Sequence, residues 1–404
     1  MEFKVHAFLR IGLFNLVLIA LLGVLMRYKI GFDFPYLSQK NIQHAHSHFA
    51  FLGWITHCLY TLLSHYIHKH SRQTVSTKYS TIIWLNLLCS YVLLFSFFFT
   101  GYSIISIILS TLSITLACWF TYCFFQDSEH LQGTKLALRW FKAGLGFHLL
   151  STIGTFYLAY IMASHRFDEH LYLASVYFYL HFQYNGFFTF VCFGLAFELL
   201  YSRFPTFTDK HHVFQLLFWS CIPAYFLSTL WTKLPTWIYW FAVSAAFLQV
   251  YAWLRFLFQI KNTLLFSAKK WSLYSTLFVF VGTAYSIKIL LQLGSTVPEI
   301  SHLAFGFRPV VIAYLHLVLL AFVSVFILAY AGYNRLIQFE KENPLPLLVF
   351  TSGVLLNELA LGIHGVASIS YLPLLHIHYY LLIIAVLIFL ATVWLFRASK
   401  KIRE

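Results

Sequence analysis

The chain has 404 residues, of which 60% are hydrophobic and only 10% are charged. Soluble globular domains carry about 25% charged residues. The composition therefore excludes that class and indicates a polytopic protein surrounded by membrane lipid. The formal net charge is +14, but the basic residues lie in short loops, where they set orientation in a membrane. The charge therefore does not indicate a nucleic-acid partner.

Twelve apolar runs are long enough to cross a bilayer, which takes about 20 helical residues. The first run is too long for the core of a signal peptide and no small-residue cleavage site follows it, so we expect a retained span. The sequence predicts an all-α polytopic membrane bundle of about twelve transmembrane helices, folded as one domain over residues 1–404. The predicted spans are 9–28, 44–66, 79–99, 102–125, 137–163, 171–201, 213–231, 236–258, 272–293, 309–333, 346–368 and 376–397.

The lysines and arginines predict the orientation of these spans. Twelve spans place both termini on one side of the membrane, and that side receives all but seven of the 27 basic residues. Positive side chains accumulate on the cytoplasmic side, so we expect both termini in the cytoplasm. The seven exceptions are Arg27, Lys29, Lys40, Arg166, Lys233, Lys288 and Arg308.

The cysteines carry no recognisable motif. All six lie within predicted spans, and none forms a CxxC pair or a CxxCH haem-attachment sequence. We expect small buried apolar side chains and no disulfide, and any haem would be held non-covalently.

The stretch QHAHSHFAFLGW, residues 43–54, places three histidines on alternate residues at the outer end of the second span. Four more histidines fall at the outer ends of spans 10, 11 and 12, given a rise of about 1.5 Å per residue. Ionisable groups within a membrane are costly and usually functional, and neutral imidazole is the commonest metal ligand. The sequence therefore predicts that this layer binds haem iron or another metal; hydrogen-bonded, water-facing histidines are the alternative. The seven are His44, His46, His48, His316, His364, His376 and His378.

A second polar group is predicted near the membrane midplane. His148 lies in span 5, and span 6 contains His181 followed by Tyr184 and Asn185. Residues three or four apart share a helix face, so the span 6 residues are expected to cluster. Two interpretations of this cluster are possible from sequence: a ligand pocket and an inter-helix hydrogen-bond network.

Charged residues near or inside spans give three further candidates. Arg308, at the outer start of span 10, could clamp a carboxylate such as a haem propionate, and Lys288 is a weaker candidate for the same role. Glu358 lies mid-membrane beside Asn357, where it could relay protons or pair with a cation. His211 and His212 fall at the cytoplasmic end of span 7 and are excluded from the outer site.

The twelve-span pattern with an outer histidine layer resembles the haem–copper oxidase superfamily, and HAHSHFAFLGW resembles a segment of nitric oxide reductase large subunits. The similar-sized NnrS family is a second resemblance. The first resemblance implies that His48 (or His44 or His46) and His316 ligate a low-spin haem b. It also implies that His181 binds copper or non-haem iron, and that Arg308 meets a propionate. The sequence departs from the superfamily where Asn185 replaces a tyrosine or glutamate and where span 10 holds one histidine.

The leading hypothesis is a bacterial inner-membrane haem protein that acts in electron transfer or respiration, or that binds or reduces nitric oxide or oxygen. An enzyme of this kind would be an oxidoreductase, with quinol or cytochrome c as electron donor. Its gas or second metal would lie near His148, His181 and Tyr184, and His376 and His378 are further metal candidates. The alternatives are a transporter for a metal ion or small solute that uses the histidine layer and Glu358, and an assembly protein without a cofactor.

Overall fold

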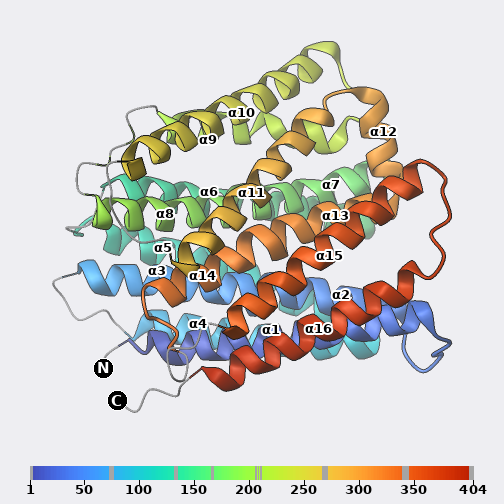
Figure 1. Cartoon of the computed structure of the whole chain (residues 1–404), viewed down its shortest axis with the longest axis horizontal. Coiled ribbons are helices and arrows are strands. Elements are labelled where there is room, and N and C mark those ends of the chain that lie inside the picture. The colour runs from blue at the N-terminus through green and yellow to red at the C-terminus, as the bar shows by residue number, and fades with distance from the viewer. Residues whose placement is uncertain are drawn as a thin grey trace. The chain divides into compact units, whose positions relative to one another are not determined.

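The fold was analysed in a computed structural model, which describes residues 3–71, 77–131, 135–164, 168–204, 207, 209, 212–265, 272–338 and 345–399. Every regular element in this part of the chain is a helix, which confirms the expected all-α fold (Figure 1). Ten of the helices are long and apolar enough to cross a membrane. They are Val5–Gly31, Lys78–Thr100, Ile104–Ser128, Lys135–Ala163, Glu169–Arg203, Thr236–Thr263, Leu273–Gly294, Arg308–Tyr333, Leu345–Ile369 and Ile377–Ala398.

The two remaining predicted spans are also helical, but they are not among those ten. Residues 44–66 lie within the continuous run α2 (Gln39–Phe49), η1 (Ala50–Thr56) and α3 (His57–His70). Residues 213–231 are covered by α9 (Val213–Cys221) and the short 3₁₀ helix η3 (Pro223–Thr229). The count of twelve spans and the orientation of the termini stay predictions.

The helices group into two compact units. The first unit comprises residues 1–132, 324–367 and 371–404, and the second comprises residues 133–323 and 368–370. The expectation of one membrane domain stays a prediction. The first unit contains α1 (Val5–Gly31), α2, η1, α3, α4 (Lys78–Thr100), α5 (Ile104–Ser128), α14 (Val325–Tyr333), α15 (Leu345–Ile369) and α16 (Ile377–Ala398). The last residues of α15, after residue 367, belong to the second unit.

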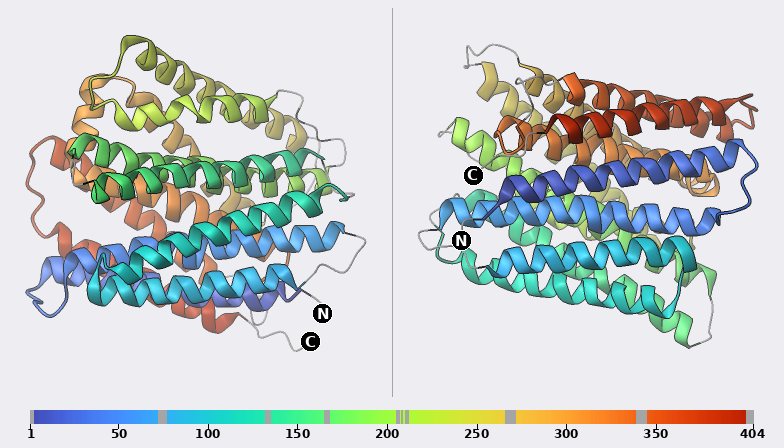
Figure 2. Two further views of the ribbon diagram at one scale, coloured as in Figure 1. Left: turned by 180° about the vertical axis from the view of Figure 1, so that it is seen from behind. Right: turned by 90° about the horizontal axis from the view of Figure 1, so that it is seen from below.

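Within the first unit α1 and α16 pack side by side and antiparallel (Figures 1 and 2). The guanidinium of Arg10, near the start of α1, lies 5.1 Å from the ring centroid of Phe396, near the end of α16. At the other end of the pair, the ring centroids of Phe32 and Tyr379 are 5.6 Å apart. The first turns of α1 and the last turns of α16 therefore lie at the same end of this unit.

One buried asparagine connects three helical segments of the first unit. Asn15 on α1 is fully buried; its amide donates to the carbonyl of Gly53 in η1, and its oxygen accepts from the hydroxyl of Tyr91 on α4. A polar side chain in an apolar membrane segment needs such partners, because hydrocarbon offers none. Asn15 therefore fixes where η1 and α4 meet α1.

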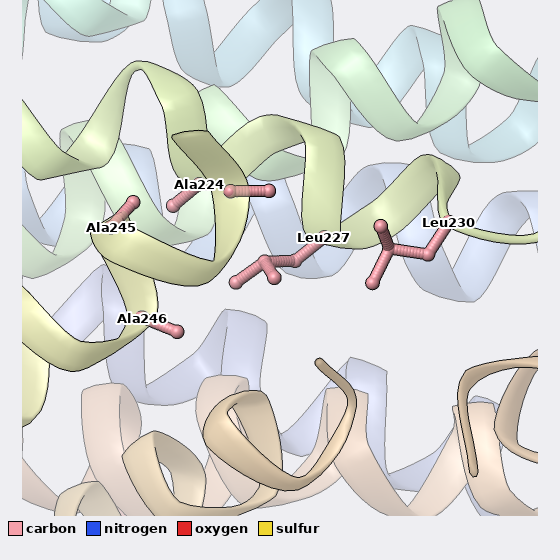
Figure 3. Packing of buried hydrophobic residues seen from close by; sticks show 6 residues of the cluster. Ala224, Leu227, Leu230, Ala245 and Ala246 are labelled. Atoms are coloured by element: carbon pink, nitrogen blue, oxygen red, sulfur yellow. The ribbon is translucent and has the colours of Figure 1, made fainter. Parts of the chain in front are cut away.

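The second unit is built on long helices connected by short turns. It contains α6 (Lys135–Ala163), α7 (Glu169–His181), η2 (Phe182–Phe188), α8 (Thr189–Arg203), α9, η3, α10 (Thr236–Leu265), α11 (Leu273–Gly294), α12 (Pro298–Gly306), α13 (Arg308–His316) and most of η4 (Leu317–Ser324). Small residues let two of these segments approach closely: Ala224 and Leu227 of η3 pack on Ala245 and Ala246 of α10 (Figure 3).

Three π-helical segments interrupt otherwise α-helical spans in the described chain, and each begins directly after a candidate histidine. Segment η1 begins two residues after His48, η2 one residue after His181, and η4 one residue after His316. A π-helix inserts extra residues into the turn and is rare, and such insertions occur frequently at functional sites. The irregular backbone therefore coincides with the histidines that the sequence singles out.

The glycines of α6 provide a test of the packing in the second unit. A Cβ at Gly154 would lie 2.6 Å from the carbonyl oxygen of Ser175 on α7, whereas a Cβ at Gly146 meets nothing within 4 Å. We expect Gly154→Ala to reduce the free energy of unfolding by about 1–3 kcal/mol, as overpacking does. Gly146→Ala on the same helix is the control and should stabilise by about 0.5–1 kcal/mol. Unfolding in detergent micelles measures both, and equal effects of the two substitutions would contradict this packing.

Candidate functional site

His44 and His48 lie on one side of α2, in an aromatic cluster of the first unit. The His48 ring stacks on Phe97 of α4 with centroids 4.3 Å apart, and the His44 ring meets Tyr102 edge-on at 4.7 Å. The two imidazole centroids are 6.4 Å apart. The predicted sharing of a helix face by these two histidines is thus observed.

The ring nitrogens of His44 and His48 form few hydrogen bonds within the protein. The Nε2 atom of His44 is buried without a hydrogen-bond partner. Among the described residues, none forms a hydrogen bond with either ring nitrogen of His48. A buried polar nitrogen without a partner is uncommon and costs about 1–3 kcal/mol of stability. Nε2 of His44 is therefore a buried atom that this fold leaves for another group, and no described residue bonds the ring nitrogens of His48.

The turn between α4 and α5 places Tyr102 against His44. Gly101 has φ = 65°, a left-handed conformation that glycine adopts without the steric cost of a Cβ. A Cβ at this position would also lie 2.8 Å from Oδ1 of Asn41. Ser103 then begins α5 with a capping box to Ser106. The aromatic cluster thus depends on a turn that the sequence specifies.

His46 lies on the other side of α2, as expected from the spacing, and contacts α1. Its Nδ1 is 3.1 Å from the carbonyl oxygen of Ile19. A carbonyl only accepts, so Nδ1 carries the proton and Nε2 carries the lone pair. This hydrogen bond holds the ring against α1.

The other outer histidines of the first unit gather between α15 and α16. The rings of His364 and His378 are 5.7 Å apart and perpendicular, and the positive charge of Arg27 on α1 acts on His364. His376 adopts a left-handed conformation at the start of α16. The structure thus brings four of the six outer histidines of this unit together in two pairs, His44 with His48 and His364 with His378.

His316 ends α13 in the second unit, directly before η4. Its Nδ1 is 2.9 Å from the carbonyl oxygen of Ile312, one turn earlier. The proton is therefore on Nδ1 and the lone pair on Nε2, the arrangement in which metal-binding histidines are usually held. Arg308, at the start of the same helix, is exposed.

His181 is fully buried and uses both ring nitrogens within the protein. Nε2 donates to the carbonyl of Cys221 at 2.8 Å, so Nδ1 is the acceptor for the amide of Asn185 at 3.0 Å. The predicted cluster of these span 6 residues is observed, and it is a hydrogen-bond network. In this arrangement neither nitrogen of His181 is open to a metal ion.

The carbonyl of Cys221 is available to accept from His181 because a proline, Pro223, follows Cys221 in the chain. Pro223 lacks an N–H and stops α9 at Cys221. The N–H of Tyr225, four residues after Cys221, instead turns to the carbonyl of Ile222 at 3.3 Å. The Cys221 carbonyl thus receives the hydrogen bond of His181.

His148 on α6 belongs to the same buried region of the second unit. The amide of Gln183 donates to Nδ1 of His148 and to the hydroxyl of Ser151, each at 2.9 Å. The His148 ring also stacks on Phe187 at 4.2 Å. Tyr184 is buried, with its ring 6.1 Å from that of Tyr314.

A small cavity adjoins this network, with room for about one water molecule. Its polar and titratable lining residues are Asn185, Thr189, Cys221, Gln249, Tyr285 and Lys288. The span 6 cluster is therefore a hydrogen-bond network that also forms part of the wall of a small cavity, and the predicted ligand pocket stays a prediction.

Glu358 lies on α15 of the first unit and is half-buried. Its Oε1 accepts a hydrogen bond from the amide of Asn357 at 3.1 Å. Among the described residues no cationic side chain forms an ion pair with it. His212 begins α9 in a left-handed conformation, and His211 lies outside the described residues.

The described chain contains no group of three or more His, Cys, Asp or Glu side chains placed to hold a metal ion. The six cysteines are free thiols; five are buried, as predicted, whereas Cys118 is exposed. The sequence matches no model of a protein family and no curated protein.

Several residues of these sites were missed from sequence. Phe97 and Tyr102 gave no signal, because aromatic residues are abundant throughout the chain. Gln249 interrupts the apolar run AAFLQVYAW and could have been found by the rule that polar residues inside spans are functional candidates. The proline in CIPAYF could have indicated that the α-helix ends here and leaves carbonyls without an intrahelical partner.

The hydrogen bond between Asn185 and His181 has a measurable energy. We expect Asn185→Leu to reduce the free energy of unfolding by about 1–3 kcal/mol, because it leaves the buried Nδ1 of His181 without a partner. In a double-mutant cycle with His181→Leu, the coupling energy should be about 0.5–3 kcal/mol. Strict additivity of the two substitutions would show that the pair does not interact.

Proposed function

We propose that the protein is an integral membrane haem protein that acts in electron transfer or in the binding or reduction of a small gas such as nitric oxide or oxygen. The observation that carries this proposal is the coincidence of π-helical segments with His48 and His316. Rare backbone insertions at two of the candidate ligands are more typical of a cofactor site than of plain helix packing.

The donor chemistry of these histidines fits haem iron. The porphyrin supplies four nitrogen ligands, so the protein needs to supply only one or two. His316 is held through Nδ1 with its lone pair on Nε2, and His48 offers ring nitrogens that no described residue uses. We propose that each of these two histidines ligates haem iron, with His44 or His46 as alternatives to His48.

When bound, haem b would supply the redox chemistry and the gas-binding position. The protein residues would orient and enclose it. Phe97 and Tyr102 would hold His48 in its stacked position, the Ile312 carbonyl would keep the proton of His316 on Nδ1, and Arg308 would meet a propionate. We do not include His181 among the ligands, because both of its nitrogens bind the protein.

The proposal extends to location. Twelve spans with both termini in the cytoplasm agree with the distribution of basic residues. A bacterial inner membrane is what the resemblance to the haem–copper oxidase superfamily implies. Quinol or cytochrome c would be the electron donor.

A second function, transport of a metal ion or small solute, is favoured by one specific observation. Glu358 is a carboxyl inside a helix that is apolar enough to cross the membrane, and no described cation pairs with it. Such residues commonly carry protons or ions in transporters.

The haem proposal predicts a coloured protein. The reduced-minus-oxidised spectrum of the detergent-purified wild type should show a Soret band and an α-band, and both His48→Ala and His316→Ala should lose or shift them. The control is His170→Ala, since His170 is exposed on α7. A colourless wild type would contradict the proposal, and unchanged bands in both variants would contradict the ligand assignment.

The transport function predicts uptake of a divalent metal ion into proteoliposomes, driven by a pH gradient. Glu358→Gln should abolish this uptake, because the amide cannot carry a proton, whereas Glu299→Gln on the exposed face of α12 should not. Absence of uptake by the wild type, or full uptake by Glu358→Gln, would eliminate this function.

A further inference from the structure

Lys288 on α11 is a buried cationic side chain that the proposed function does not use. It is 2% exposed, and its Nζ lies 5.2 Å from the ring centroid of Tyr285. An ammonium group in an apolar interior is costly unless polar groups solvate it. The ring face of Tyr285 offsets part of this cost. No carboxylate among the described residues forms an ion pair with Lys288.

The cavity beside Lys288 is lined by two oxygen atoms that lack a partner. Oδ1 of Asn185 and Oε1 of Gln249 are both buried without a hydrogen bond, and each side chain is 5% exposed. The orientation of the Asn185 amide is fixed, because its nitrogen must donate to Nδ1 of His181. Its oxygen therefore cannot be exchanged for the nitrogen by rotating the group.

The balance of donors and acceptors identifies the ligand. An anion in this cavity would be repelled by the fixed oxygen of Asn185. A metal cation would be repelled by the ammonium of Lys288. A water molecule satisfies all three groups, because it can donate to Asn185 and Gln249 and accept from Lys288. The cavity has room for about one such molecule.

We propose that this cavity is an internal water-binding site through which Lys288 exchanges a proton. In the exchange step an N–H bond of the ammonium breaks, its electron pair stays on Nζ, and the proton passes to the oxygen of the bound water, which becomes hydronium. The reverse step returns the proton, so no other reactant is needed.

The titratable groups around Lys288 come from three helices. His181 on α7 has both nitrogens engaged, and the Cys221 thiol lies on α9. Tyr285, one turn earlier on α11, presents its ring to Nζ. Helix α10 contributes Gln249, which does not titrate.

The test is solvent exchange at the lysine side chain in the full-length protein, labelled with ¹⁵N-lysine in lipid bilayers. The Nζ signal of Lys288 is assigned by its loss in Lys288→Met. In the wild type we expect a cross-peak between these Nζ protons and water, and their replacement by deuterium from D₂O. Gln249→Leu should slow this replacement at least tenfold, because it removes one of the two acceptors for the water.

Gln259→Leu is the matched control, since Gln259 is a buried glutamine on the same helix that does not line the cavity. It should leave the exchange of Lys288 unchanged. Absence of any water contact at Lys288 in the wild type would overturn the proposal, whatever the variants do, and so would equal slowing by the two glutamine substitutions. The haem spectrum does not enter this test, so the two proposals fail separately.

Discussion

The structure depends on one constraint: a polar group inside an apolar membrane segment must find its partner within the protein. Water and lipid headgroups are out of reach there, and an unsatisfied group costs several kcal/mol. Asn15 shows the constraint in the first unit, where one side chain reaches both η1 and α4. The carbonyl of Cys221 shows the same constraint in the second unit. The α-helix ends before Pro223, and this carbonyl accepts a hydrogen bond from His181 instead.

This constraint divides the histidines into two classes. His148 and His181 are buried and bond amide side chains, and His181 uses both of its ring nitrogens within the protein, which is typical of structural histidines. His48 and His44 lie among aromatic rings with nitrogens that no described residue bonds or that are buried without a partner. The second class is the one that a cofactor would complete.

The sequence predicted the fold well because hydrophobic length determines membrane helices directly. Two predicted spans are not among the ten helices that are long and apolar enough to cross a membrane, and even these coincide with helical segments at residues 39–70 and 213–229. The spacing of His44, His46 and His48 correctly predicted which of them share a side of α2.

The partners of the candidate residues could not be predicted in the same way, because they depend on which helices lie next to one another. The stacking of His48 on Phe97 and the bond from His181 to Cys221 join segments about 40 to 50 residues apart. The π-helical segments were also invisible in the sequence, since their insertions leave the apolar pattern unchanged. Lys288 was noted as a charge near a span end, but its burial beside two open oxygens required the fold.

The central claim is that His48 and His316 each ligate haem iron. A density map of the full-length protein, purified from its native membrane, tests this most directly. The account predicts a planar density of porphyrin size beside each of these histidines, bonded to a nitrogen of its ring. Well-resolved rings of His48 and His316 that contact only protein and lipid would contradict it.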